Sequence, residues 1–470
     1  MSPEIQPNDV ERAPVVETVD EEELYGPSQE LLQNVKAALA EADIPQVEAQ
    51  IDALHPADVA DLIEHLDPEE RRLFLEITKH VLEAETISHL EDTLRDEVVD
   101  QMKPEELAEV VSELDSDDAV EILENLDEER QQQVLEVIPH EDRVHLKQGL
   151  TYPEESAGRL MQHELVSIPL HWNVGQTIDY LRSAKELPDD FYNLYVVDRL
   201  NKPVGSVPLS RAMRSPRDTN LSEIMETELR LVPADTDQEA VAYLFRQYAL
   251  VSAPVVDENG KLIGVVTVDD VVRVIDQEAE EDLLNIVGVG DTEFHDPAHT
   301  TAFRRIQWLV VTLINTLIAS VVISRFEGTI GQFPSLAVLM PITAAMGGNA
   351  GVQVITVTVR ALATRDITHN SNVWRIIGKE LVVGFINACI FATILGTLGA
   401  LWFGHIQLGF VLGGAMIFNM VWAGFAGTVI PLAMDRLGFD PATGAGPFLT
   451  TTTDCLGFFS FLGLATLFLR

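Results

Sequence analysis

The 470-residue sequence is poor in basic residues, with 31 lysines and arginines against 75 aspartates and glutamates and a net charge of −44 at pH 7. This excess of negative charge excludes nucleic acid as a partner. Only two cysteines occur, Cys389 and Cys455, and both lie in apolar segments, so neither disulfides nor thiolate metal sites are indicated. The histidines lack H-x-x-H and H-E-x-x-H spacings, and no P-loop or nucleophile–base constellation appears. The polar, acidic N-terminus does not read as a signal peptide. We therefore do not expect an enzyme.

The charge is distributed unevenly along the chain. Residues 301–470 carry nine basic and six acidic residues, whereas residues 1–300 carry 22 basic and 69 acidic ones. The mean hydropathy of +0.11 is therefore an average over two unlike parts. We expect an acidic soluble part that attracts divalent cations, followed by a membrane domain.

Five apolar stretches are each long enough to span about 30 Å of hydrocarbon. An odd number of spans puts the two ends of the chain on opposite sides of the membrane. With the N-terminus inside, seven basic residues flank the spans on the inner side and two on the outer side, as the positive-inside rule requires. We expect a multi-pass protein of the inner or plasma membrane with cytoplasmic soluble domains. The predicted spans are Ile306–Ser324, Ser335–Ala361, Ile376–Phe403, Leu408–Met434 and Gly446–Leu469.

The last span contains a lone carboxylate, Asp454, which follows the run Thr450–Thr453. A charge at mid-membrane depth costs about 3 kcal/mol. No basic residue in this segment precedes Arg470, so a cation is the leading candidate partner for Asp454. A protonated carboxyl that is hydrogen-bonded between helices is the alternative.

The second span contains Pro341 and the glycine-rich run Gly347–Gly351. These residues predict a loosened helix, and such backbone is tolerated in a membrane only where protein or a wet cavity satisfies it. Asn349 and Gln353 lie one turn apart on one face of this helix. Close helix packing through small residues is the alternative interpretation.

Asp454 and Asn349 supply oxygen ligands, which suit hard cations such as magnesium or calcium rather than copper or zinc. One carboxylate per chain does not neutralise a divalent ion. A two-fold symmetric homodimer would bring two copies of Asp454 to one axis and balance the charge. Asn419, in the fourth span, could also face a polar interior, but we assign it no role.

Residues 27–150 are predicted to be helical throughout. His55–Glu70 and Lys103–Asp118 share a proline at a helix start, apolar residues at 3–4 spacing and an acidic connector that caps the next helix. Short helical repeats of this kind stack into a superhelix. Residues 1–26 are acidic and of low complexity, and we expect them to be disordered.

Residues 151–275 contain a second repeat, in which Met161–Pro169 matches Met225–Pro233. Each copy predicts a short strand, a helix, two strands and a helix, and the pair resembles tandem CBS modules, which sense ligands. The second copy has a segment similar to the ribose-and-phosphate motif of that fold, with Thr267 and Asp270 as candidates for binding an adenine nucleotide such as ATP. The first copy lacks the acid.

Val268–Ile286 is predicted to be an acidic helix that connects the CBS pair to the first span. Several of its carboxylates are i,i+4 neighbours and repel one another, so the helix is more stable beside cations. Its position suits it to transmit a change to the membrane. An exposed acidic linker is the alternative.

The order of acidic helical repeat, CBS pair, acidic helix and five spans resembles the MgtE family of magnesium channels and transporters. Gly347–Gly351 and Thr450–Gly457 are similar to the membrane signatures of that family. The resemblance implies a homodimer in which Asp454 binds the pore ion, and a pore that closes when intracellular magnesium bridges the soluble domains to the connecting helix. The bridging acids that it implies are Asp117, Glu121, Asp237, Glu239, Asp270, Glu278, Glu281, Asp282 and Asp440. The chain departs from the family pattern at Arg273 and Ala249, where acids are usual.

We therefore predict a multidomain membrane protein that imports magnesium through a dimeric pore gated by intracellular magnesium. The alternative is an adenine-nucleotide-regulated transporter of another divalent cation, such as cobalt or manganese. The predicted parts are a disordered tail (1–26), an all-α superhelical domain (27–150), an α+β tandem CBS pair (151–275), a connecting helix and linker (268–300) and a five-helix transmembrane domain (301–470).

Overall fold

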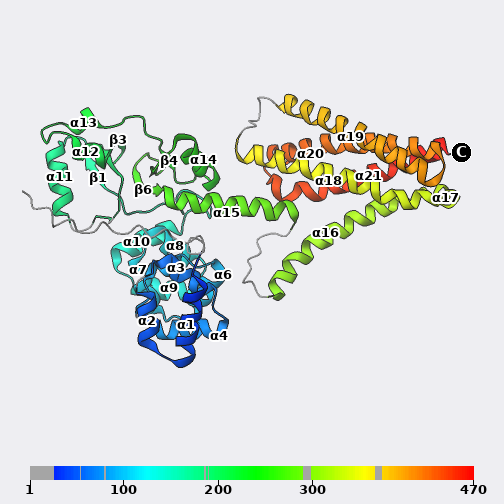
Figure 1. The fold of residues 1–470 in the computed structure, drawn as a ribbon. Coiled ribbons are helices and arrows are strands. Elements are labelled where there is room, and N and C mark those ends of the chain that lie inside the picture. Colours follow the sequence, from blue (N-terminus) through cyan, green and yellow to red (C-terminus); the bar gives the residue numbers. More distant parts are fainter. Residues whose placement is uncertain are drawn as a thin grey trace, which may run out of the picture. The chain divides into compact units, whose positions relative to one another are not determined.

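The computed structural model describes residues 26–469 except 53, 79–80, 185–186, 189, 289–297 and 366–372. The tail predicted over 1–26 and most of the linker that precedes the first span lie outside the described residues. The chain folds as two compact units (Figure 1). The first comprises Met1–Thr236 and Ala253–Val266, and the second comprises Asp237–Ser252 and Thr267–Arg470.

The N-terminal part of the first unit is all-α. Three of its helices begin at a proline, Pro56, Pro68 or Pro104, because a helix start needs no amide hydrogen at that position. The described residues of this part form α1 (Gln29–Glu41), α2 (Ile44–Ile51), α3 (Pro56–Glu64), α4 (Pro68–Thr78), α5 (Ala84–Ser88), α6 (Asp92–Gln101), α7 (Pro104–Glu113), α8 (Ser116–Glu124), α9 (Glu128–Val137) and α10 (His140–Gly149).

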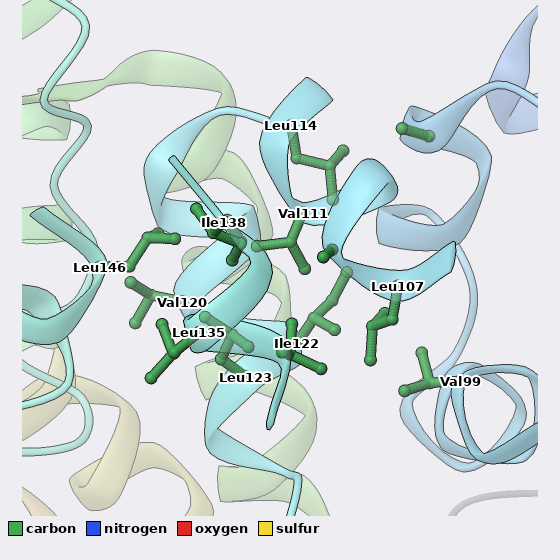
Figure 2. Close-up of a cluster of buried hydrophobic side chains, with 14 of the residues drawn as sticks. Val99, Leu107, Val111, Leu114, Val120, Ile122, Leu123, Leu135, Ile138 and Leu146 are labelled. Atoms are coloured by element: carbon green, nitrogen blue, oxygen red, sulfur yellow. The ribbon is translucent and has the colours of Figure 1, made fainter. Parts of the chain in front are cut away.

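Apolar residues at 3–4 spacing give these helices their buried faces. Figure 2 shows one of the two cores, where Leu107 and Val111 of α7 pack near Ile122 and Leu123 of α8 and Leu135 of α9. A second cluster joins α1 to α4 and the segments that follow. The predicted all-α N-terminal domain is confirmed.

The CBS pair consists of two three-stranded sheets of the same topology. In each sheet the first strand is parallel to the second, and the third lies on the other side of the second. The first sheet contains β1 (Ser167–Pro169), β2 (Asn193–Val197) and β3 (Pro203–Pro208), followed by α12 (Leu209–Arg214) and α13 (Leu221–Ile224), with α11 (Val174–Ser183) between β1 and β2. The second contains β4 (Val232–Pro233), β5 (Ser252–Val256) and β6 (Leu262–Thr267), with α14 (Gln238–Tyr248) between β4 and β5.

The two copies exchange equivalent segments. A Cβ added at Gly264 would lie 2.7 Å from the Sδ of Met161, and a Cβ added at Gly205 would lie 2.7 Å from the Sδ of Met225. Each copy therefore needs a glycine where the methionine that opens the other copy approaches its third strand. The predicted repeat is thus a pseudo-symmetric pair.

The C-terminal part of the second unit contains five helices that are 27 to 31 residues long and apolar enough to cross a membrane. The predicted five-helix domain is confirmed, and the helices extend beyond the predicted spans into polar flanks. They are α16 (Ala298–Ser324), α18 (Ser335–Ala363), α19 (Val373–Phe403), α20 (Ile406–Arg436) and α21 (Pro441–Phe468), with the short α17 (Glu327–Gln332) before α18.

Helix α20 is the most enclosed of the five. In the apolar stretch of α20 that could lie in the membrane, 61% of the residues are buried, compared with 6–33% in the corresponding stretches of the other four helices. It packs against α18, α19 and α21, and α16 packs against α21. Backbones approach closely where Gly409 of α20 meets Gly396 of α19, because no side chain separates them.

The prediction that the second span is loosened is wrong. Helix α18 is continuous from Ser335 to Ala363, and Pro341 lies within it. Its glycines make room for neighbouring side chains instead: Gly347 faces Asn419, and Gly351 faces Leu449 of α21. The alternative interpretation, close packing through small residues, describes this segment.

We predict that Gly409→Ala destabilises the membrane domain by about 1–3 kcal/mol, the usual cost of overpacking. The new methyl group would overlap the carbonyl oxygen of Gly396, which is backbone and does not move cheaply. Gly414→Ala is the matched control, since its Cβ would lie 3.4 Å from Leu464, an ordinary contact. The thermal unfolding midpoint of the purified protein in detergent measures both. Equal midpoints for the two variants would contradict the packing of α19 on α20.

Candidate metal sites

The carboxylate of Asp454 lies on α21, in the middle of the last span. Helix α21 begins at Pro441 and is capped by Asp440, whose side chain accepts from the amides of Ala442 and Thr443. The threonines before Asp454 bond back to carbonyl groups of their own helix, so the polar run stays helical. Asp454 is half-buried, and among the described residues its carboxylate has no hydrogen bond or ion pair. It is therefore available to a ligand.

Asn349 lies on α18, which packs against α21. Its side chain and that of Gln353 are both exposed in the single chain, so no other described helix covers this polar face. The described residues contain no group of three or more aspartate, glutamate, histidine or cysteine side chains arranged to hold a metal ion.

A second group of carboxylates, the α14–α15 acidic cluster, consists of Asp237, Glu239, Glu278, Asp282 and Asp440. Helix α15 runs from Val268 to Val287 and packs against both α14 and α21. The amide of Gln238 donates to Glu278 over 2.8 Å and so fixes the first turn of α14 on α15.

Burial and mutual repulsion both raise the pKa of carboxylates in this cluster. Partial burial, followed by the charges of Glu278 and Asp237, raises the pKa of Glu239 to about 7. Burial, followed by the charge of Asp440, raises the pKa of Asp282 to about 6. No lysine or arginine within the described part of the chain forms an ion pair with Glu239 or Asp282. A bound divalent cation would relieve this repulsion.

One arginine approaches the cluster without pairing with it. The guanidinium of Arg365, in the loop after α18, lies 4.9 Å from the ring centroid of Tyr243 on α14. Its positive charge slightly offsets the rise in the pKa of Glu239. The sequence analysis used Arg365 only as a positive-inside residue, and no local pattern pointed to this contact.

Asp270 is engaged differently from the cluster. It is buried, and its two oxygens accept from the hydroxyl of Thr267 at 2.5 Å and from the guanidinium of Arg273 at 2.8 Å. Thr267 and Asp270 are thus brought together at the start of α15, as the nucleotide motif requires. Glu281 is exposed and accepts from the amide of Asn285 over 3.2 Å.

The remaining predicted acids, Asp117 and Glu121, belong to the first unit and make contacts within it. Asp117 is buried and accepts from the amide of Gln162 over 3.5 Å. Glu121 forms an ion pair with Arg95 at 3.0 Å. The charge of Glu121 is therefore already compensated inside the unit.

Two further residues make contacts that the sequence did not predict, although Asn419 was noted as a polar residue of the fourth span. Gln238 joins α14 to α15, and a single glutamine in an acidic segment gives no signal of such a role. Asn419 is completely buried on α20, where its amide donates to the carbonyl oxygen of Thr343 over 2.8 Å. Its position in an apolar span was the available signal.

The chain matches three family models: a divalent cation transporter over residues 340–464, the MgtE intracellular N domain over 54–155 and a CBS domain over 221–277. The magnesium transporter MgtE of Thermus thermophilus is 32% identical over 462 residues, which is 94% of this chain and 99% of that protein. The magnesium transporter MgtE of Enterococcus faecalis is 34% identical over 330 residues, covering 70% and 73%.

Among solved structures, the cytosolic domain of the Mg²⁺ channel MgtE in complex with ATP is 31% identical, with a TM-score of 0.49, over 52% of this chain and 99% of that one. The family models and the sequence relatives together define a divalent cation transporter that also carries an MgtE intracellular N domain and a CBS domain. The relatives are named transporters, which are not enzymes. The chain belongs to the MgtE family of magnesium transporters, and the resemblance noted in the sequence is confirmed.

The raised pKa values predict that packing of α14 on α15 weakens as pH rises. Folded Glu239 and Asp282 hold their protons up to about 7 and 6, whereas the ordinary values are 4.5 and 3.8. The stability that these two protonated carboxyls contribute is therefore fully present below about pH 4 and is lost progressively as pH rises toward 7. In metal-free buffer, amide hydrogen exchange in α14, corrected for its intrinsic rate, should be several-fold faster at pH 8 than at pH 5.

Glu239→Gln should remove about half of this pH dependence, because the pKa values of Glu239 and Asp282 are raised by similar amounts, and added Mg²⁺ should restore protection at pH 8. Glu280→Gln is the control, since Glu280 is an exposed acid of α15 that perturbs neither Glu239 nor Asp282. Identical pH profiles for the wild type and Glu239→Gln would refute the electrostatic account.

Proposed function

We propose that this chain forms a homodimer in which Mg²⁺ crosses the membrane beside Asp454, and that Mg²⁺ on the inner side closes the pore. The observation that carries the proposal is the lone carboxylate of Asp454, half-buried at membrane depth with no partner among the described residues. Such a group is costly in a membrane and is kept where an ion passes. The substrate follows from family membership.

The chemistry of Mg²⁺ fits a site made of few protein ligands. The ion gives up its water reluctantly and is commonly held by one or two carboxylates together with several waters. Two copies of Asp454 on a two-fold axis would balance its charge. The exposed amides of Asn349 and Gln353 support the dimer, because polar groups at lipid depth need a protein or water partner.

The membrane potential supplies the driving force in this proposal. Each charge that crosses 100 mV gains about 2.3 kcal/mol, so a divalent ion gains about 4.6 kcal/mol when the inside is negative. No second energy source is needed. The cytoplasmic location of the soluble domains follows from the basic residues that flank the spans.

The end of α15 is placed to act on the pore helix. A Cβ added at Gly446 of α21 would lie 3.1 Å from the carbonyl oxygen of Ile286, near the last turn of α15. The side chain of Ile286 packs on a cluster that includes Ala445 and Leu449. Asp454 follows Gly446 by eight residues, about 12 Å along the helix.

Gating then follows from the α14–α15 acidic cluster. At low inner Mg²⁺ its carboxylates repel, which loosens α15 from α14 and α21. At high inner Mg²⁺, bound ions bridge the carboxylates and hold α15 against Gly446. The imported ion thereby inhibits its own further import. The roles of Asp117, Glu121, Asp270 and Glu281 in binding regulatory Mg²⁺ stay predictions.

A nucleotide at Thr267 and Asp270 also stays a prediction. The pair lies at the start of α15, so a ligand there would act on the same helix that ends beside α21. The adenine-nucleotide-regulated transporter of cobalt or manganese remains the alternative function, and nucleotide-dependent flux of those ions with no response to inner Mg²⁺ would favour it.

Asp454→Asn should abolish Mg²⁺ flux into reconstituted vesicles, because an amide of the same shape supplies no negative charge to the ion. The protein should insert and migrate as the wild type does on size exclusion. Glu327→Gln, which neutralises an exposed acid in α17, is the control and should leave flux unchanged. Normal Mg²⁺ flux in the Asp454→Asn variant would contradict the assignment of Asp454 to the pore.

Glu239→Gln combined with Glu278→Gln should leave flux at low inner Mg²⁺ unchanged and relieve its inhibition at high inner Mg²⁺ by about tenfold or more in the inhibitory concentration. Removal of two ligands weakens the bridging ion, and removal of two charges weakens the repulsion that the ion relieves. Glu280→Gln should keep wild-type inhibition. Unchanged inhibition in the double variant would contradict the sensor at this cluster.

A further inference from the structure

Asn419 is a polar residue in the most enclosed helix of the membrane domain. Its side chain is completely buried on α20. The amide nitrogen donates to the carbonyl oxygen of Thr343 on α18 over 2.8 Å. This bond joins two helices at a depth where the surrounding residues are apolar.

The amide group also occupies a space formed by two glycines from different helices. A Cβ added at Gly457 of α21 would lie 2.7 Å from the amide nitrogen of Asn419, and a Cβ added at Gly347 of α18 would overlap the amide. Gly347 precedes Asn349 by two residues, and Gly457 follows Asp454 by three. One side chain therefore contacts both helices that carry the predicted ion ligands.

This arrangement has a cost that packing alone does not explain. The amide oxygen of Asn419 is buried without a hydrogen-bond partner in the described part of the chain. A buried acceptor left unsatisfied is unfavourable, and an apolar side chain of similar size would avoid the penalty. A buried polar group kept at such a cost is most useful where it fixes one geometry among several.

We infer that Asn419 is a positioning residue for ion transport: its amide, bonded to Thr343 and seated between Gly347 and Gly457, sets the separation and rotation of α18 relative to α21 at the ion site. Asn419 does not touch the ion. The inference rests on the proposed role of Asp454, since α21 carries that carboxylate.

The first test is Asn419→Leu, which keeps the branching at Cγ, adds volume and removes the bond to Thr343. The KM for Mg²⁺ flux into vesicles should rise about three- to tenfold, the equivalent of one hydrogen bond. The maximal rate per inserted protein should change less than twofold. The ratio of Mg²⁺ to Co²⁺ flux should shift as well, since a displaced ligand alters discrimination between similar ions.

Thr428→Val is the matched control for a merely structural role. Thr428 is also completely buried on α20, but its hydroxyl bonds only to the carbonyl oxygen of Gly424 in its own helix, at 3.0 Å. This variant should keep the wild-type KM and ion ratio even where its thermal unfolding midpoint falls. A rise in KM equal to that of Asn419→Leu would overturn the positioning role.

A double variant keeps the inference testable if Asn419→Leu does not fold. Asn419→Ala opens space, and Gly457→Ala fills part of it with a methyl group on the facing helix. The combined Asn419→Ala and Gly457→Ala variant should regain thermal stability relative to Asn419→Ala, but its KM should stay raised. Recovery of both stability and KM would show that Asn419 only fills volume and would overturn the inference.

The outcome is separable from that of the proposed function. Wild-type KM and ion ratio in the Asn419 variants, together with an inactive Asp454→Asn, would overturn the inference and leave the pore intact. Full activity of Asp454→Asn would instead remove the pore assignment on which the inference rests.

Discussion

Uncompensated carboxylate charge is the constraint on which the rest of this structure depends. In the first unit, three of the acids are paired with arginines: Glu121 with Arg95, Asp100 with Arg130, and Glu124 with Arg159. In the second unit, Glu239, Asp282 and Asp454 have no such partner among the described residues. A bound cation would therefore relieve unfavourable charge at these three carboxylates.

In the proposed gating, helix packing would convert this local charge into an effect at the membrane. Helix α15 has a fixed start, where Thr267 and Arg273 hold Asp270, and its end meets Gly446 of α21. Because α15 is a continuous helix that is held at both ends, a force on its middle acts on the contacts at those ends. Glu278 and Asp282 lie between those ends, so repulsion or bridging there alters the contact beside α21.

Much of the fold was accessible from the sequence because its signals are local. Apolar runs mark the five spans, 3–4 spacing with prolines marks the N-terminal helices, and repeated Met-x-x-Glu segments mark the CBS pair. Features that depend on a residue's neighbours in space could not be predicted in this way. The run Gly347–Gly351 was expected to loosen its helix, but Gly347 and Gly351 each accommodate a side chain from another span, and no local pattern announces that partner.

The candidate sites show the same division. Charge density along the sequence correctly drew attention to the acidic connecting helix, but it did not rank the acids. Glu121 and Glu239 look alike in the sequence, yet an arginine 26 residues before Glu121 neutralises it, whereas Glu239 meets further carboxylates. Ranking them requires knowledge of which charges the fold brings near, and at Glu239 the charge of Arg365 offsets only part of the rise in pKa caused by burial and neighbouring acids.

The two departures from the family pattern follow from these contacts. Arg273 stands where an acid is usual, and it supplies Asp270 with an internal counter-ion at 2.8 Å. Ala249 stands where another acid is usual, and its left-handed backbone, with a φ of 49°, ends α14. Both changes remove negative charge from regions away from the end of α15. The carboxylates whose pKa is raised by neighbouring acids are Glu239 on α14 and Asp282 on α15, and Asp282 lies in the half of α15 that leads to α21.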